Sequence, residues 1–201
     1  MNLSTQYAAL RASLAFLIVA ALATAPARAM VVVKRDFPDL VARSEQIVIG
    51  TATDIHEQLD SSGTPFTLVT FSDLTVLKGD VAATLTLRFY GGHAGDVVVG
   101  IPDMPVFTLG ERDVLFVAGN GEVVCPLVGV WQGRFYVHFD PAMGADVVED
   151  SAHQPVTGLA GRELMRAPAA VARGTTPMTL DDFRSAIADE LAHPHATDAA
   201  P

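Results

Sequence analysis

Apolar and polar residues alternate along several short stretches of the chain, and this alternation predicts β-strands. The clearest stretch covers residues 85–89, which read Leu-Thr-Leu-Arg-Phe. Residues 47–55 and 135–139 show the same two-residue period. Because successive side chains of a strand point to opposite faces, each stretch is expected to bury one face of a sheet.

The stretch 67–77 keeps the strand pattern but changes phase within it. Val69 and Phe71 place the apolar side at odd positions, whereas Leu74 and Val76 place it at even positions. One extra residue in a strand shifts the phase and bends the chain, so we predict a β-bulge near residues 72–73. Long bent strands are typical of small closed barrels.

Residues 101–118 join a loop to the most apolar part of the chain. Prolines at 102 and 105, followed by Gly110, predict a loop in the first half. The apolar run 114–118 predicts a strand buried on both faces. With glycine turns between short strands, the pattern predicts an all-β, mainly antiparallel fold, and we expect a small OB-like barrel.

Helical periodicity occurs on either side of these strands. Asp36 followed by Pro38 predicts the start of a short helix that ends near residue 44. Thr179 and Asp182 form an imperfect capping box. The residues after it share one helical face: Leu180, Phe183, Ile187 and Leu191. We therefore predict a short N-terminal helix and a C-terminal helix.

The first 29 residues have the pattern of a secretory signal peptide. An apolar run covers residues 12–25, and Ala27-Arg28-Ala29 supplies the small residues that a signal peptidase requires. We expect cleavage after Ala29 and a secreted or periplasmic protein. No later stretch approaches the roughly 20 apolar residues of a spanning helix, so no membrane insertion is expected.

The remaining chain divides by composition into three parts. Residues 30–140 are expected to form the β-barrel domain. Residues 141–177 contain scattered Gly, Pro and Ala without periodicity, which predicts a partly ordered linker. Residues 178–201 are expected to form the C-terminal helix and a frayed tail.

The charge balance and the cysteine content restrict the partners. The 201-residue chain has a formal net charge of −10. Removal of residues 1–29 leaves 11 basic and 23 acidic residues, a net charge of −12. Such an acidic surface argues against nucleic acid and anionic membranes as partners.

Cys125 is the only cysteine, which excludes an intrachain disulfide. We interpret it as a small buried apolar residue, with a reactive thiol or an intermolecular disulfide as the alternative.

The sequence offers no catalytic, cofactor or metal site with a specific spacing. The glycines of residues 91–95 lack the Gly-Lys-Ser/Thr of a phosphate loop, and no His-Glu-x-x-His helix is present. Glu111 is expected to stabilise its Gly-Glu turn by accepting backbone amides and to pair with Arg112 or Arg134. Trp131 is expected to pack in the core, with a binding surface shared with Tyr136 as the alternative.

The order of the turns, rather than any single motif, resembles a group of uncharacterised exported bacterial β-barrel proteins. The resemblance covers residues 37–139. Its structural signature consists of Lys78, Gly79, Gly91, Gly92, Pro105, Gly110, Glu111 and Gly133. The layout is also distantly similar to the OB-type domains of netrin-like proteins and metalloproteinase inhibitors. Those inhibitors use an N-terminal cysteine and a disulfide framework, which this chain lacks, so the resemblance implies a barrel but not the inhibitory residues.

Three functional hypotheses follow. The first is a non-enzymatic binding or accessory module for a protein or carbohydrate partner. Its candidate contact surface comprises His93, Asp96, Asp103, Met104, Phe107 and Tyr136. The second is a protease inhibitor or protease-associated protein, with a secreted protease as partner. The third is a small metal-dependent hydrolase that uses His93, Asp96 and Asp103.

Overall fold

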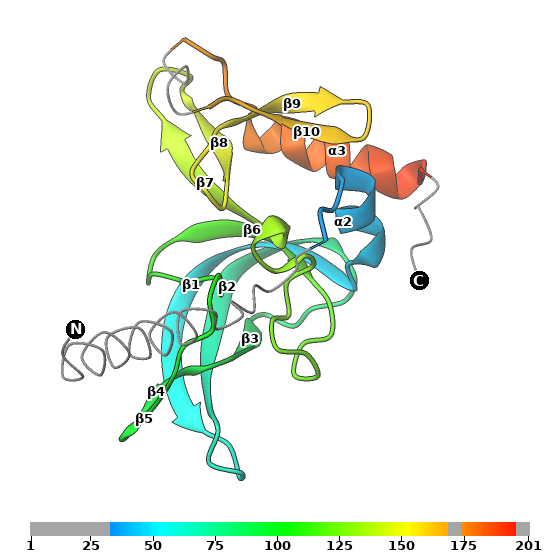
Figure 1. The fold of residues 1–201 in the computed structure, drawn as a ribbon. Coiled ribbons are helices and arrows are strands. Elements are labelled where there is room, and N and C mark those ends of the chain that lie inside the picture. The colour runs from blue at the N-terminus through cyan, green and yellow to red at the C-terminus, as the bar shows by residue number, and fades with distance from the viewer. Residues whose placement is uncertain (1–32, 169–173, 196–201) are drawn as a thin grey trace, which may run out of the picture. The chain divides into compact units, whose positions relative to one another are not determined.

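The computed structural model describes residues 33–168 and 174–195, so the predicted signal peptide lies outside the described residues (Figure 1). The described chain is mainly antiparallel β-structure with helices at both ends, as the sequence predicts. The elements in chain order are α2 (Phe37–Arg43), β1 (Gln46–Leu59), β2 (Pro65–Lys78), β3 (Leu85–Tyr90), β4 (Gly92–Ala94), β5 (Val97–Val99), β6 (Arg112–Val117), the 3-10 helix η1 (Val130–Gly133), β7 (Arg134–Asp140), β8 (Ala145–Asp150), β9 (Val156–Ala160), β10 (Glu163–Arg166) and α3 (Leu180–Ala192).

The main sheet is open, so the predicted OB-like barrel is not confirmed. Among the described residues, its six strands have the order β3-β2-β1-β6-β7-β8, and β3 and β8 do not pair with each other. Groups from outside the sheet form hydrogen bonds with the backbone of both edge strands, β3 and β8. The Asn120 side chain donates to the Thr86 carbonyl at 2.8 Å and accepts from the Arg88 amide at 3.0 Å. On β8, the Val148 amide donates to the Met178 carbonyl at 3.1 Å. Because these backbone groups of the edge strands already have hydrogen-bond partners, they do not require the sheet to close into a barrel.

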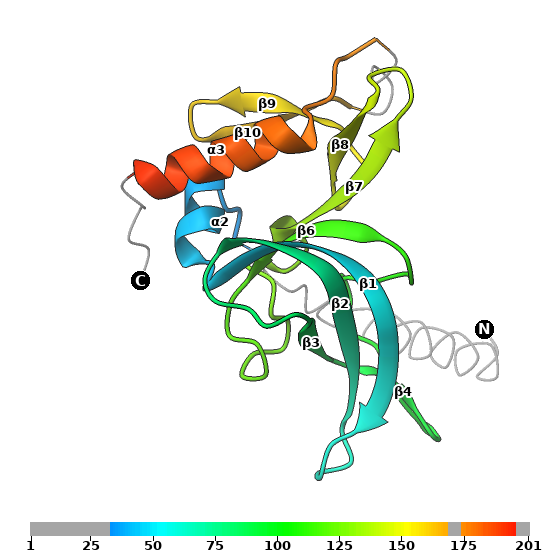
Figure 2. The same ribbon diagram turned by 180° about the vertical axis from the view of Figure 1, so that it is seen from behind.

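The predicted bulge in β2 is confirmed. The pairing of β1 with β2 shifts register where Ile49 faces Thr75 and Thr51 faces Ser72. Asp73 lies in this step with a left-handed φ of 53°. Both β1 and β2 are strongly curved (Figure 2). An extra residue on one strand increases the local twist and bend, which explains the phase change in the sequence.

Strand β6 lies between two hydrophobic clusters, one on each face of the sheet. Val114 and Phe116 belong to the first cluster, whereas Leu115 and Val117 belong to the second. The first cluster includes Phe37 of α2 and Phe183 of α3, whose ring centroids are 5.7 Å apart. The second lies against the loop that precedes β6. The prediction of a strand buried on both faces is therefore confirmed.

Residues 141–177 do not form the partly ordered linker that the sequence predicts, although 169–173 lie outside the described residues. They contain β8, at the edge of the main sheet, and the β9–β10 hairpin, which lies beside α3 in both ribbon views (Figures 1 and 2). These strands are four to six residues long, and Val148, Val156 and Leu164 are their contributions to the first cluster. So few apolar residues per strand leave no detectable period.

Both predicted helices are present with their predicted caps. The Asp36 carboxylate accepts from the Asp39 amide at 2.9 Å, and the Thr179 hydroxyl accepts from the Asp182 amide at 3.1 Å. Within the described residues, no helix combines the length and the hydrophobicity that crossing a membrane requires.

Candidate functional site

A buried arginine, Arg134, stands at the centre of the most unusual polar cluster in the described chain. It is the first residue of β7, and its side chain is only 2% exposed. Its Nε and Nη2 atoms each donate to one carboxylate oxygen of Asp113, both at 3.0 Å. Asp113 lies on the neighbouring strand β6 and is fully buried. The bidentate pairing satisfies both oxygens of a carboxylate that has no access to water.

The other groups of Arg134 are also engaged. Nη2 donates to Glu111 Oε2 at 2.9 Å, and Nη1 donates to the Val106 carbonyl at 2.5 Å. The guanidinium lies 3.9 Å from the ring centroid of Phe107 and 4.3 Å from that of Tyr136. One side chain thus connects β6, β7 and the loop before β6 through charge-assisted and cation–π contacts.

Burial dominates the electrostatics of this cluster. Burial raises the pKa of Asp113 to about 6, although the hydrogen bonds and the charge of Arg134 act in the opposite direction. Burial also raises the pKa of Tyr136. The His153 ring stacks on the ring of Tyr136 with a centroid distance of 4.1 Å.

Glu111 has the structural role that the sequence predicts. Its Oε2 accepts from the Thr108 amide at 2.9 Å and pairs with Arg134. Arg112, the alternative partner, pairs instead with Asp146 at 2.6 Å. The Gly110-Glu111 turn is therefore held from within the turn and from the neighbouring strand β7.

Two cavities flank the loop segment 104–106, which we call the ridge. The first cavity, about 290 Å³, lies between the curved strands β1–β3 and the loop, and the second, about 410 Å³, is lined by Trp131, Arg134 and Tyr136. Met104, Pro105 and Val106 line both cavities. Val106 is 80% exposed, whereas its carbonyl is bound by the buried Arg134. The ridge therefore combines an exposed apolar side chain with a fixed backbone.

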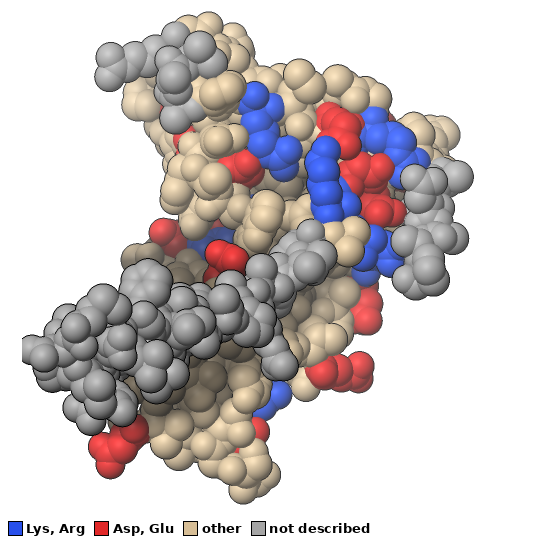
Figure 3. Space-filling model, in the orientation of Figure 1, with Lys and Arg blue, Asp and Glu red and all other residues tan. Residues whose placement is uncertain are grey.

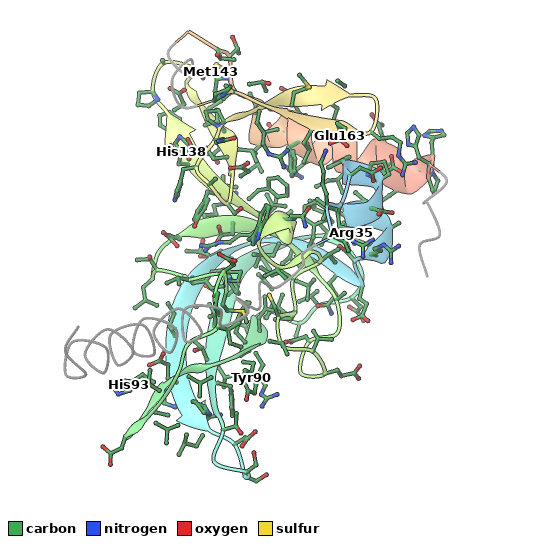
Figure 4. The ribbon with its side chains drawn as sticks, in the orientation of Figure 1. Arg35, Tyr90, His93, His138, Met143 and Glu163 are labelled. Carbon is green, nitrogen blue, oxygen red and sulfur yellow. The ribbon has the colours of Figure 1, made fainter. Side chains whose placement is uncertain are left out.

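The structure brings some of the predicted contact residues together. Asp103, Met104 and Tyr136 line the second cavity, and Met104 and Phe107 line the first. His93 lies on β4, in a short β4–β5 hairpin that replaces the predicted loop, and its exposed side chain projects outward (Figure 4).

Asp96 lies in the turn of that hairpin and, like His93, lines neither cavity. In the described part of the chain, no group of three or more His, Cys, Asp or Glu residues could hold a metal ion. His93, Asp96 and Asp103 therefore do not form the metal site that the hydrolase hypothesis requires.

Trp131 does not pack in the core as the sequence analysis expects. It is 40% exposed and lines the second cavity. Gly129 and Val130 both adopt left-handed φ angles, 67° and 61°, and they turn the chain into η1. The buried side chain of that turn is that of Gln132, whose Oε1 accepts from the Arg35 amide at 2.8 Å and whose Nε2 donates to the Val33 carbonyl at 2.9 Å. The polar residue Gln132 is therefore buried, whereas the aromatic residue Trp131, which we expected in the core, is exposed.

The glycines and the lysine of the sequence signature have structural roles. Lys78 Nζ donates to the Val41 and Ala42 carbonyls at 2.8 and 3.2 Å, which caps the C-terminal end of α2. A Cβ at Gly133 would lie 2.7 Å from the Val128 carbonyl oxygen, too close for any side chain. Left-handed φ angles occur at Gly79, Gly91, Gly92 and Gly110.

Cys125 is half-buried and packs against the second cluster. Burial raises the pKa of its thiol to about 11. This environment supports its interpretation as a small apolar residue rather than a reactive thiol.

The complete set of partners around Arg134 makes it an anchor for the ridge. A guanidinium that is already bound to two carboxylates and a carbonyl positions those groups instead of presenting a free charge to a substrate. The chain matches no protein-family model, and no curated protein or solved structure is significantly similar to it. Its function is therefore inferred from the geometry of the ridge and its two cavities.

Proposed function

We propose that the protein is an exported, non-enzymatic binding module that engages a protein partner through the ridge and the two cavities beside it. The single observation that carries this proposal is the ridge itself, which is apolar and exposed on top and fixed from beneath by Arg134. Pre-organised backbone reduces the entropy that a binding surface loses on association.

The neighbourhood of the ridge supports the same function. Trp131, which lines the second cavity, is 40% exposed, and Leu109, three residues after Val106, is 60% exposed, so apolar side chains of this region remain in water. Exposed apolar groups next to pockets are typical of interaction sites, and aromatic residues with a polar atom are enriched there. The contact surface proposed from the sequence centres on the same loop, through Asp103, Met104 and Phe107.

The proposal is tested with two valine variants of matched chemistry. Val106→Asp places a charge on the ridge, whereas Val123→Asp places it on another exposed valine, 45% exposed, that lines neither cavity. Immobilised protein is incubated with periplasmic extract and culture medium, and retained proteins are quantified by mass spectrometry. We expect Val106→Asp to lose the retained partner and Val123→Asp to keep it. Both variants are expected to melt at the same temperature, which shows that the loss is not due to unfolding. Equal retention by both variants contradicts the role of the ridge.

The compartment is part of the same proposal, because it determines which partners are encountered. We propose export by the signal peptide and a mature N-terminus at Met30. Fractionation of the producing cells, with mass spectrometry of the intact protein, tests this. A chain found in the cytoplasm with residues 1–29 still attached contradicts export.

A protease-associated role is the second candidate, by analogy with OB-type netrin-like domains. The observation in its favour is that the bent strand β2 ends in the Lys78-Gly79 turn, as in those domains. A zymogram of secreted proteases with and without the protein tests it. Unchanged band intensities over a range of protein concentrations contradict this role.

A further inference from the structure

The first cavity has almost uniformly apolar walls. Ile55, Val69 and Phe89 contribute from the sheet, and Ile101 and Phe107 contribute from the loop. Among the described residues that line it, Glu57 is the only one that carries a charge at neutral pH. Its volume, about 290 Å³, is at the lower limit of cavities that bind whole small molecules, so it suits a single large side chain.

The carboxylate of Glu57 is available to a ligand. In the described part of the chain, no hydrogen bond or ion pair joins the Glu57 side chain to another residue, and this side chain is exposed. The neighbouring Thr67 hydroxyl is already committed, because it donates to the Gly91 carbonyl at 2.9 Å. Gly92 keeps the approach open, since a Cβ there would lie 3.1 Å from Glu57 Oε1.

This situation differs from that of the acids over α2 and the β9–β10 hairpin. Over α2 and the β9–β10 hairpin, basic and acidic side chains lie next to each other (Figure 3). Lys34 pairs with Glu163 there at 2.8 Å, and Arg162 pairs with Asp36 at 2.6 Å. Those acids are neutralised within the protein, whereas Glu57 is an unpaired negative charge beside an apolar cavity in a chain of net charge −10.

We infer that the first cavity binds an apolar side chain of a polypeptide partner in which a lysine or arginine directly adjoins that residue. The apolar side chain fills the cavity, and its basic neighbour pairs with Glu57. Low-dielectric walls strengthen such a pair and repel an acidic neighbour. This inference rests on the proposed function, because the ridge, with Val106 80% exposed, forms one wall of the cavity and extends the contact beyond a single side chain.

The test uses four short capped peptides that differ at one position at a time. Acetyl-Ala-Phe-Lys-Ala-amide is compared with versions that replace Lys by Gln or by Glu, and with one that replaces Phe by Ala. Binding is measured by NMR titration of the methyl groups of the purified full-length gene product. We expect the Phe-Lys peptide to bind about two- to fivefold more tightly than Phe-Gln, the range for solvent-exposed ion pairs. Phe-Glu is expected to bind more weakly still, and Ala-Lys is expected not to bind.

Two charge variants locate the effect. In Glu57→Gln, the Phe-Lys and Phe-Gln peptides should bind equally, with the affinity of Phe-Gln unchanged. In Glu122→Gln, which removes the same charge from an exposed residue that lines neither cavity, the preference for lysine should remain. Both glutamates are exposed, so neither variant is expected to disturb folding.

Several results would overturn the inference. These are an equal affinity of Phe-Lys and Phe-Gln for the unmodified protein, a preference that survives Glu57→Gln, and binding of free phenethylamine without binding of any peptide. If partner retention still depends on Val106 in those cases, only the inference about the cavity fails. If Val106→Asp and the unmodified protein retain the same proteins, the proposed function fails as well.

Discussion

Replacement of Arg134 by methionine is the most demanding test of the buried cluster. The variant keeps an unbranched side chain, which is shorter and apolar, and removes every donor. Asp113, which is fully buried, then keeps a carboxylate without a partner, and the Val106 carbonyl loses its hydrogen bond. Glu111 is affected less, because its side chain is 33% exposed and can be hydrated.

The expected cost follows from the burial of the pair. Breaking a buried ion pair by removal of one partner costs about 3–5 kcal/mol. For a domain of this size, each kcal/mol lowers the melting temperature by about 2–4 °C, so a decrease of about 6–20 °C is expected. The double variant Arg134→Met/Asp113→Leu removes the stranded charge as well. We expect it to recover most of the loss, since apolar replacements of buried pairs are often neutral or stabilising.

Urea unfolding, followed by far-UV circular dichroism and by the fluorescence of Trp131, measures these differences. Trp131 is the only tryptophan of the chain, so its emission reports on the second cavity. A loss below about 1 kcal/mol in Arg134→Met refutes the assigned importance of the buried pair. A double variant as unstable as the sum of its single changes refutes the coupling between Arg134 and Asp113. Although its stability recovers, the double variant should bind partners more weakly than the unmodified protein, because no side chain fixes the Val106 carbonyl.

Three further outcomes are expected. The pKa of Asp113, about 6 in the folded protein against an ordinary 3.8, means that this group favours folding below about pH 4 and loses that contribution as the pH rises through 6. The unfolding free energy of the unmodified protein, minus that of Asp113→Asn, should therefore decrease from pH 4 to pH 7. Cys125, with its raised pKa, should react with iodoacetamide at pH 8 far more slowly than free cysteine, and equal rates contradict its burial. Gly133→Ala should cost about 1–3 kcal/mol in urea unfolding, because the Val128 carbonyl must move, whereas Gly100→Ala enters open space and should change little.

Local features of the fold could be predicted from the sequence because neighbouring residues determine them. The shift of apolar phase after Phe71 identified the bulge at Asp73 before any partner strand was known. The caps at Asp36 and Thr179 depend on hydrogen bonds three residues apart. In the same way, the Gly-Glu turn at Glu111 indicated an acceptor for nearby amides.

Features that depend on distant residues were not accessible in the same way. Barrel closure would need β3 and β8 to pair, and nothing in either strand shows that Asn120 and Met178 instead satisfy groups at the two edges. Trp131 and Gln132 exchange the positions expected from their polarity because the Gln132 side chain hydrogen-bonds to Arg35 and Val33, which precede it by 97 and 99 residues.

The site was predictable only in part. The sequence left Arg112, the next residue along the chain, and Arg134 as alternative partners of Glu111 and did not decide between them. It did not indicate that Asp113, near the start of β6, would receive the guanidinium of Arg134. Asp113 and Arg134 each stand directly before an apolar strand pattern, and this pair of oppositely charged residues at two strand entrances was the available signal.

Strand β6 has a consequence for how the protein unfolds. Its alternate side chains belong to the two clusters. A loss of packing in either cluster therefore displaces the strand that also contributes side chains to the other. The described chain should therefore melt in one cooperative step, and the amides of β6 should exchange with solvent only through global opening. Regions that respond to a partner are then confined to the loop and the β4–β5 hairpin, while the sheet beneath them stays closed.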